Sequence, residues 1–216
     1  MDLNDQLDEF LDNNFMNLEL KKPLFYNSHI AIRYELGGDL EGKKRIDRVT
    51  LRALSIFNEI CEINDMIYLT LFVDSWSDNP VSCFEKNVYA NLNYYSRTRI
   101  EDIDKRELEY RYKDPEDHDD ETITLQYCTK TEVKNLKVKD LFEAVAHRES
   151  EPESRIEGDI YLINETKKCI FHIYDSRGMD IVATDTFTLR SVYEKYYEWI
   201  LDFDRKTIDQ IFNNQI

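Results

Sequence analysis

The sequence predicts an α+β fold, or a mixed α/β fold, in which helices flank a β-sheet. Some segments alternate apolar and polar residues with a period of two, as half-buried strands do. Others repeat apolar residues at spacings of three and four, as amphipathic helices do. The 216 residues include only 5 Gly and 4 Pro, which argues against turn-dense small barrels. The 14 Tyr, 11 Phe and 2 Trp supply apolar area for a core.

The first third of the chain has the pattern of helix, strand, helix and strand. Apolar residues recur at helical spacing in residues 2–14 and 45–63, whereas residues 29–36 alternate. Residues 66–73 are an unbroken apolar run, which is typical of a strand that is covered on both faces. Because a helix connects the two strands, we expect a strand–helix–strand unit with parallel strands.

A central hairpin follows. Residues 107–113 and 122–127 both alternate, which predicts two antiparallel strands with Leu108 opposite Tyr127. Between them, residues 114–121 contain six carboxylates and a proline, and cannot become ordered by burying apolar surface. We expect them to form a solvated acidic hairpin tip.

The rest of the chain predicts a helix, a three-stranded β-meander and C-terminal helices. The expected positions are 138–145 for the helix, 159–163, 169–174 and 179–183 for the strands, and about 187 and 204 for the starts of the last helices. The predicted organisation is an N-terminal α/β domain at 1–148, an acidic linker at 149–157 and a C-terminal meander-plus-helix domain at 158–216. The two parts are either separate or packed as one unit.

Charge and cysteine content exclude several classes of function. The net charge of −16 would repel a phosphate backbone, so we expect no general nucleic-acid binding. No apolar run approaches the length of a membrane span, and the N-terminus lacks the pattern of a signal peptide, so we expect a cytoplasmic protein without membrane contact. The four cysteines form no CxxC pair, and we predict no metal or other cofactor.

The acidic charge is concentrated in two segments. Residues 101–121 and 149–157 carry a net charge of −10, most of the total of −16. Charge gathered in this way steers a basic partner, so we predict a basic protein as partner. The predicted contact residues are Asp114, Glu116, Asp117, Asp119, Asp120 and Glu121. By analogy with small acidic proteins that neutralise nuclease toxins, the predicted function is a non-catalytic interaction module, of immunity or antitoxin type.

A glycine-rich turn supports an alternative function. Residues 37–43 fit the pattern GxxxxGK, follow a predicted strand and precede a predicted helix, as a phosphate-binding loop does. Lys44, however, stands where such loops have Ser or Thr. We therefore favour an ordinary turn. A nucleotide or phosphate-ligand binder that uses Gly37, Gly42 and Lys43 is the alternative.

The helix after this turn is rich in basic residues, Lys43, Lys44, Arg45, Arg48 and Arg52. The three arginines share one helix face and could meet a phosphate or a carboxylate partner. Because the chain is acidic, we favour a solvated face paired with carboxylates such as Asp47 and Glu59.

The turn after the second meander strand holds a cluster of Asp175, Arg177, Gly178 and Asp180. Arg177 could bind an anion or neutralise the neighbouring carboxylates, and we expect Gly178 to adopt a positive φ. On the preceding strand, His172 is expected to be a packed, hydrogen-bonded core residue rather than a general base. No HExxH motif, nucleophile elbow or EF-hand spacing occurs, which favours a protein that is not an enzyme.

Several segments resemble an uncharacterised bacterial domain-of-unknown-function family with a C-terminal FHIYDSRGMD-type signature. The matching segments are Ile170–Asp180, Leu189, Arg190, Tyr193, Trp199–Asp202, Ile30–Leu36 and Arg52–Phe57. The positions that the resemblance singles out are Asp175, Arg177, Gly178 and Asp180. It implies a Rossmann-like element, but no activity, cofactor or partner.

Overall fold

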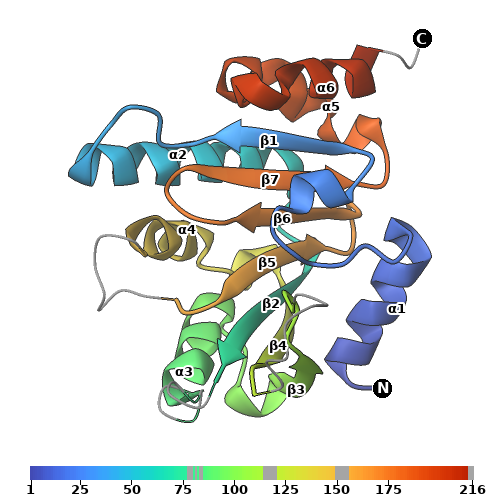
Figure 1. The fold of residues 1–216 in the computed structure, drawn as a ribbon, viewed down its shortest axis with the longest axis vertical. Coiled ribbons are helices and arrows are strands. Elements are labelled where there is room, and N and C mark those ends of the chain that lie inside the picture. The colour runs from blue at the N-terminus through green and yellow to red at the C-terminus, as the bar shows by residue number, and fades with distance from the viewer. Residues whose placement is uncertain (77–79, 81, 83–84, 114–120, 149–155, 214–216) are drawn as a thin grey trace.

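The computed structural model describes all residues except 77–79, 81, 83–84, 114–120, 149–155 and 214–216. The described strands form one sheet of seven strands in the order β1-β7-β6-β5-β2-β4-β3, which confirms an α+β fold (Figure 1). The strands are β1 (Ala31–Glu35), β2 (Met66–Ser75), β3 (Asp104–Glu109), β4 (Ile123–Glu132), β5 (Asp159–Asn164), β6 (Cys169–Ile173) and β7 (Gly178–Ala183). The helices are α1 (Leu3–Phe15), α2 (Gly42–Ile60), α3 (Glu85–Ser96), α4 (Val138–His147), α5 (Thr186–Lys195) and α6 (Asp202–Asn213).

The predicted unit of parallel strands is wrong. β1 and β2 run in the same direction, but β5, β6 and β7 lie between them, and every neighbouring pair of described strands is antiparallel. This pairing also excludes a Rossmann-like element from the described sheet. The helical pattern of α2 shows only that the chain crosses the sheet, since a 19-residue helix of about 28 Å can pass over several strands. The division of the chain at 149–157 stays a prediction.

The hairpin of β3 and β4 is confirmed, but its predicted register is wrong. Leu108 lies opposite Thr124, and Tyr127 lies opposite Lys105. β4 is buried on both faces, so the alternation of its apolar residues does not identify one core face. The aromatic residues Tyr110 and Tyr112 lie beyond the end of β3 and do not pair with β4.

The two faces of the sheet differ in polarity. On one face α2 and α4 pack on the sheet, and the ring of Phe57 lies 6.0 Å from that of Phe142 and 5.1 Å from that of Phe171. The other face is covered by α1, which contacts β3 and β4, and by the chain that follows it, which passes in front of β7 and β6 in Figure 1. Arg33, Asp180 and His172 are paired across β1, β7 and β6 beneath this cover. These polar residues lead to a pocket at the end of β1 and β6.

Candidate anion-binding site

A pocket of about 560 Å³ opens where β1 and β6 end and β5 and β7 begin. The β1–α2 turn, the β6–β7 turn and the chain after α1 meet there. The charged residues that line it are Lys22, Arg33, Arg45, Arg177, Glu35 and Asp175, and Pro23, Tyr174 and Leu201 supply apolar surface. Cations therefore outnumber acids in this pocket, although the whole chain carries a net charge of −16.

Arg33 is compensated by a buried ion pair. Its Nε and Nη2 donate to the two carboxylate oxygens of Asp180 at 2.7 and 2.9 Å. Burial alone would lower the pKa of Arg33, but the hydrogen bonds and charge of Asp180 outweigh burial and raise the pKa. Asp180 also accepts a hydrogen bond from the backbone N–H of Phe25 at 3.0 Å, which fastens the chain after α1 to the sheet.

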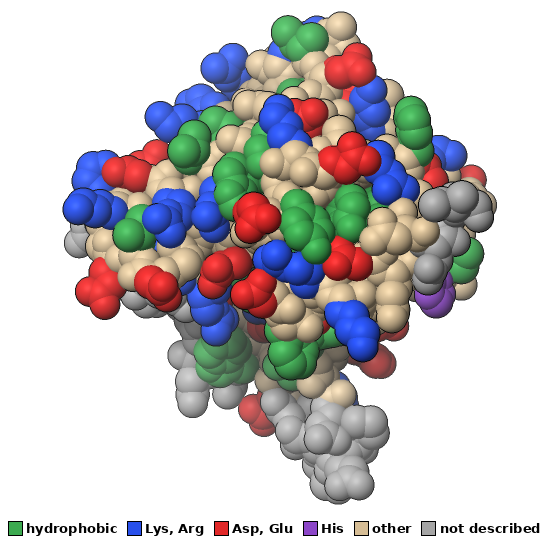
Figure 2. Space-filling model, turned by 90° about the horizontal axis from the view of Figure 1, so that it is seen from above, with side chains coloured by type: hydrophobic (Ala, Val, Ile, Leu, Met, Phe, Trp, Pro, Cys, Tyr) green, Lys and Arg blue, Asp and Glu red, His purple; other side chains and the backbone are tan. Residues whose placement is uncertain are grey.

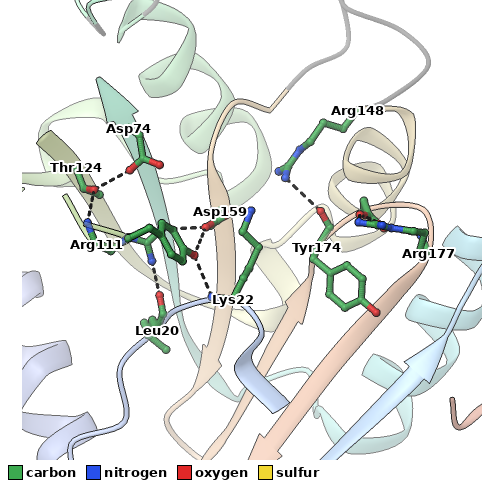
Figure 3. A network of polar contacts seen from close by, with 11 residues as sticks. Leu20, Lys22, Asp74, Arg111, Thr124, Arg148, Asp159, Tyr174 and Arg177 are labelled. Carbon is green, nitrogen blue, oxygen red and sulfur yellow. Dashed lines mark hydrogen bonds and ion pairs between the residues drawn. The ribbon is translucent and has the colours of Figure 1, made fainter. Parts of the chain in front are cut away.

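Asp159 compensates Lys22 and joins three parts of the chain (Figure 3). Lys22 Nζ lies 2.7 Å from one carboxylate oxygen, while Arg111 and the hydroxyl of Tyr112 both donate to the other at 2.9 Å. Arg111 also donates to the carbonyl of Leu20. Burial would raise the pKa of Asp159, but the hydrogen bond and charge of Lys22 outweigh burial and lower the pKa.

Arg45 differs from these cations because its partners are neutral. Nε donates to Ser176 Oγ at 2.9 Å, and Nη1 donates to the carbonyls of Gly38 and Leu40 at 2.7 and 3.3 Å. No carboxylate among the described residues pairs with this half-buried guanidinium. Arg45 lies in the first turns of α2, where the helix dipole adds further positive potential.

The two adjacent glycines of the β1–α2 turn make room for arginine side chains. A Cβ atom at Gly37 would lie 2.6 Å from Cζ of Arg45 and would also meet the carbonyl oxygen of Ser176. Gly38 has φ of +56°, and a Cβ there would lie 2.9 Å from Nη1 of Arg48. Any larger residue would displace these guanidinium groups.

Of the predicted phosphate-binding residues, only Gly37 lies beside Arg45. Gly42 begins α2, and a Cβ there would meet no atom within 4 Å. Lys43 is 84% exposed, pairs with Asp47 at 2.7 Å and borders a neighbouring hollow between α2 and α4. The basic residue of this turn that lines the pocket, Arg45, therefore lies two residues beyond the lysine that the sequence motif indicates.

The arginine face of α2 is not paired with carboxylates as we expected. Arg52 Nη1 donates to the backbone carbonyl of Glu35 at 2.8 Å, and its guanidinium lies 5.0 Å from the ring centroid of Trp199. Burial and the charge of Arg48 lower the pKa of Arg52 despite the opposing charge of Glu35. The carboxylates that we expected to pair with this face bind lysines instead, Asp47 to Lys43 and Glu59 to Lys195.

The cluster predicted at the β6–β7 turn is divided in the structure. Arg177 pairs with Asp175 within the turn, whereas Asp180 lies inside the sheet with Arg33. Gly178 does not adopt the expected positive φ. Its lack of a side chain is needed for space, because a Cβ there would collide with the hydroxyl of Tyr174.

His172 lies beneath this end of the sheet and is 1% exposed. Its ring stacks on that of Tyr161 at a centroid distance of 4.3 Å, which confirms a packed histidine. The expected hydrogen bond is wrong, since neither ring nitrogen has a partner among the described residues. Burial lowers the pKa of His172 to about 3, so the ring is neutral near pH 7.

Of the predicted acidic contact residues, Asp114, Glu116, Asp117, Asp119 and Asp120 lie outside the described residues. Glu121 is described and exposed. In the described part of the chain, no group of three or more His, Cys, Asp or Glu could hold a metal ion. Nor does any helix there have the length and apolar character needed to cross a membrane.

The comparisons with known proteins give a family but no activity. The family model of a domain of unknown function, DUF3885, matches residues 7–204, which include every residue that lines the pocket. The chain is 24% identical over 212 residues to the uncharacterized protein YnaE of Bacillus subtilis (strain 168), and this match covers 90% of the chain and 96% of YnaE. No solved structure matches the chain. The chain therefore belongs to the bacterial family DUF3885, whose function is unknown.

Proposed function

We propose that this protein binds a small anionic ligand, carrying a phosphate or carboxylate group, in the pocket at the end of β1 and β6. The observation that supports this proposal is the state of Arg45. A half-buried guanidinium without a counter-ion is unfavourable, and proteins normally place a carboxylate beside it. Here the chain supplies three neutral acceptors that fix the orientation of the side chain instead.

These contacts leave hydrogen-bond donors for a ligand. A guanidinium has five N–H groups, and the three hydrogen bonds of Arg45 use those of Nε and Nη1. The two N–H groups of Nη2 stay available as charge-assisted donors to the oxygens of a phosphate or carboxylate group. The other pocket cations, Lys22, Arg33 and Arg177, have carboxylate partners of their own, so the uncompensated charge of the pocket is that of Arg45.

Isothermal titration calorimetry with inorganic phosphate and with succinate tests the proposal. We expect binding by the wild type and a loss of about 10- to 100-fold in affinity for Arg45→Gln, because charge-assisted hydrogen bonds contribute about 1.5–3 kcal/mol. Lys43→Gln is the matched control, since it removes the same charge from the same helical turn outside the pocket. Equal affinities of Arg45→Gln and the wild type, or no binding of either anion, would refute the proposal.

A second proposal rests on the distribution of acidic charge. Residues 101–121 and 149–157 carry −10 of the net charge of −16, and we propose that they attract a basic protein, in an immunity or antitoxin-type role. Changing Asp117, Asp119 and Asp120 together to Asn should slow association with such a partner and weaken its salt dependence. Association rates at two ionic strengths measure this effect. Unchanged rates for the triple variant would contradict the proposal.

A further inference from the structure

The arginine face of α2 begins at the pocket, with Arg45, and continues along the helix. Arg45, Arg48 and Arg52 are three and four residues apart, so they share one face over a rise of about 10 Å. Each of them contacts the chain between Glu35 and Gly38, at the end of β1. Arg45 binds the Gly38 carbonyl, Arg48 lies against Gly38, and Arg52 binds the carbonyl of Glu35. Arg45 lines the pocket itself, whereas Arg48 and Arg52 lie beyond it and contact Gly38 and Glu35, two residues that line it.

No carboxylate among the described residues pairs with any of these arginines, and the chain does not lack acids. It has 44 Asp and Glu against 28 Lys and Arg. Figure 2 shows the molecule from the side on which α5 and α6 lie above β1 in Figure 1, and acidic side chains are interspersed with Lys and Arg there. Arg48 and Arg52 lie one helical turn apart, an arrangement in which like charges destabilise a helix. Such a row is stabilised when an anion lies along it.

Resting on the proposed anion pocket, we infer that the ligand is an elongated polyanion with an oligophosphate chain. One phosphate group lies at Arg45, and the following groups reach Arg48 and Arg52. A single phosphate or a short carboxylate is too small to contact all three arginines along a helical rise of about 10 Å. Phosphate oxygens suit this row because Arg48 and Arg52 can each bind two of them in parallel, while Nη2 of Arg45 donates to a further one. Inorganic polyphosphate and a nucleoside triphosphate share this chemistry.

The test compares the affinities of phosphate, pyrophosphate, tripolyphosphate and ATP at one ionic strength by calorimetry. We expect the affinity to rise by about 10-fold or more from phosphate to tripolyphosphate, since each added arginine contact is charge-assisted. Arg48→Gln and Arg52→Gln should each reduce this gain and leave the affinity for phosphate unchanged. Lys44→Gln is the matched control, because it removes the same charge from an exposed neighbouring position.

Arg52 also contacts Trp199, so thermal unfolding of each variant must show that it is folded, and Arg52→Lys keeps the charge where Arg52→Gln unfolds. Equal affinities for phosphate and tripolyphosphate would refute the elongated ligand and leave the anion pocket intact. A length-dependent gain that persists in Arg48→Gln and in the folded Arg52 variant would also refute it. The absence of binding by all four anions would instead refute the proposed function. Among supporting results, tighter binding of tripolyphosphate than of ATP indicates an inorganic chain, and the reverse order a nucleotide.

Discussion

Protonation of His172 should make the fold sensitive to mild acid. The pKa of His172 is about 3 in the folded protein because the ring is fully buried, whereas an unfolded histidine titrates near 6.5. Between these values the unfolded chain binds one proton more than the folded chain, so stability falls as the pH falls. From pH 7.5 to 4.5 this one residue should reduce the free energy of unfolding by about 2–3 kcal/mol.

His172→Phe is the variant that isolates this effect. Phenylalanine can stack on Tyr161, and its ring leaves no buried nitrogen without a partner. Urea unfolding at pH 7.5, 6.5, 5.5 and 4.5 gives the free energy for each protein. We expect the wild type to lose about 2–3 kcal/mol more than His172→Phe across this range.

The comparison within each protein removes two complications. Carboxylates that do not interact with His172 affect the wild type and the variant alike, which leaves Asp159 as the coupled group, and each protein is referred to its own value at pH 7.5. His29→Gln, at an exposed position, should retain the pH dependence of the wild type. If the wild type and His172→Phe show the same pH dependence, His172 is not held neutral by burial, and the reasoning fails.

Three further outcomes are expected. Asp180→Asn removes the carboxylate charge beside Arg33, and urea unfolding should show that the free energy of unfolding falls by about 3 kcal/mol. This value is near the lower end for a broken buried ion pair, because Asp204 lies 3.8 Å from Arg33 and partly replaces the lost charge; a fall below about 1 kcal/mol would contradict the prediction. Gly37→Ala should displace Arg45 and weaken anion binding about 10-fold in calorimetry. Gly42→Ala should not weaken binding in the folded protein, because its added methyl group meets no atom and its φ of +53° strains only the local backbone; equal affinities of the two variants would show that Gly37 does not position Arg45. Burial and the charge of Asp159 raise the pKa of Tyr112 to about 12, whereas an unfolded tyrosine titrates near 10, so stability should fall above about pH 10. Urea unfolding at about pH 8 and 10.5 should show a smaller fall for Tyr112→Phe than for the wild type, and an equal fall would contradict the role of Tyr112.

Local periodicity predicted most elements of the fold, but not how the strands are arranged. The helix predicted at 45–63 is found at Gly42–Ile60, and the unbroken apolar run that predicts β2 is a central strand covered on both faces. The order of the strands depends on pairing between distant segments, for which alternation gives no partner. One element, α3, was not predicted, although Val88, Leu92 and Tyr95 have helical spacing and are buried.

The sequence could predict some residues of the site, but not how the fold brings them together. The glycine-rich turn and the three arginines at helical spacing are visible in the sequence, but their meaning depends on remote contacts. Arg45 is held by Ser176, which lies 131 residues later in the chain. The ion pair of Lys22 with Asp159 and that of Arg33 with Asp180 also join distant segments. A motif search favours Lys43 because such a search considers neighbours in sequence, whereas the pocket is formed by neighbours in space.

The position of β1 has a consequence for synthesis of the chain on the ribosome. Among the described strands β1 pairs with β7 alone, and about 140 residues separate Glu35 from Gly178. At translation rates of 5–20 residues per second, β1 waits roughly 7–28 s for its partner to be made. During this interval both of its edges lack a neighbouring strand, a state that promotes association between nascent chains. The charges of Arg33 and Glu35 oppose that association, so the residues that later line the pocket also protect the unfinished protein.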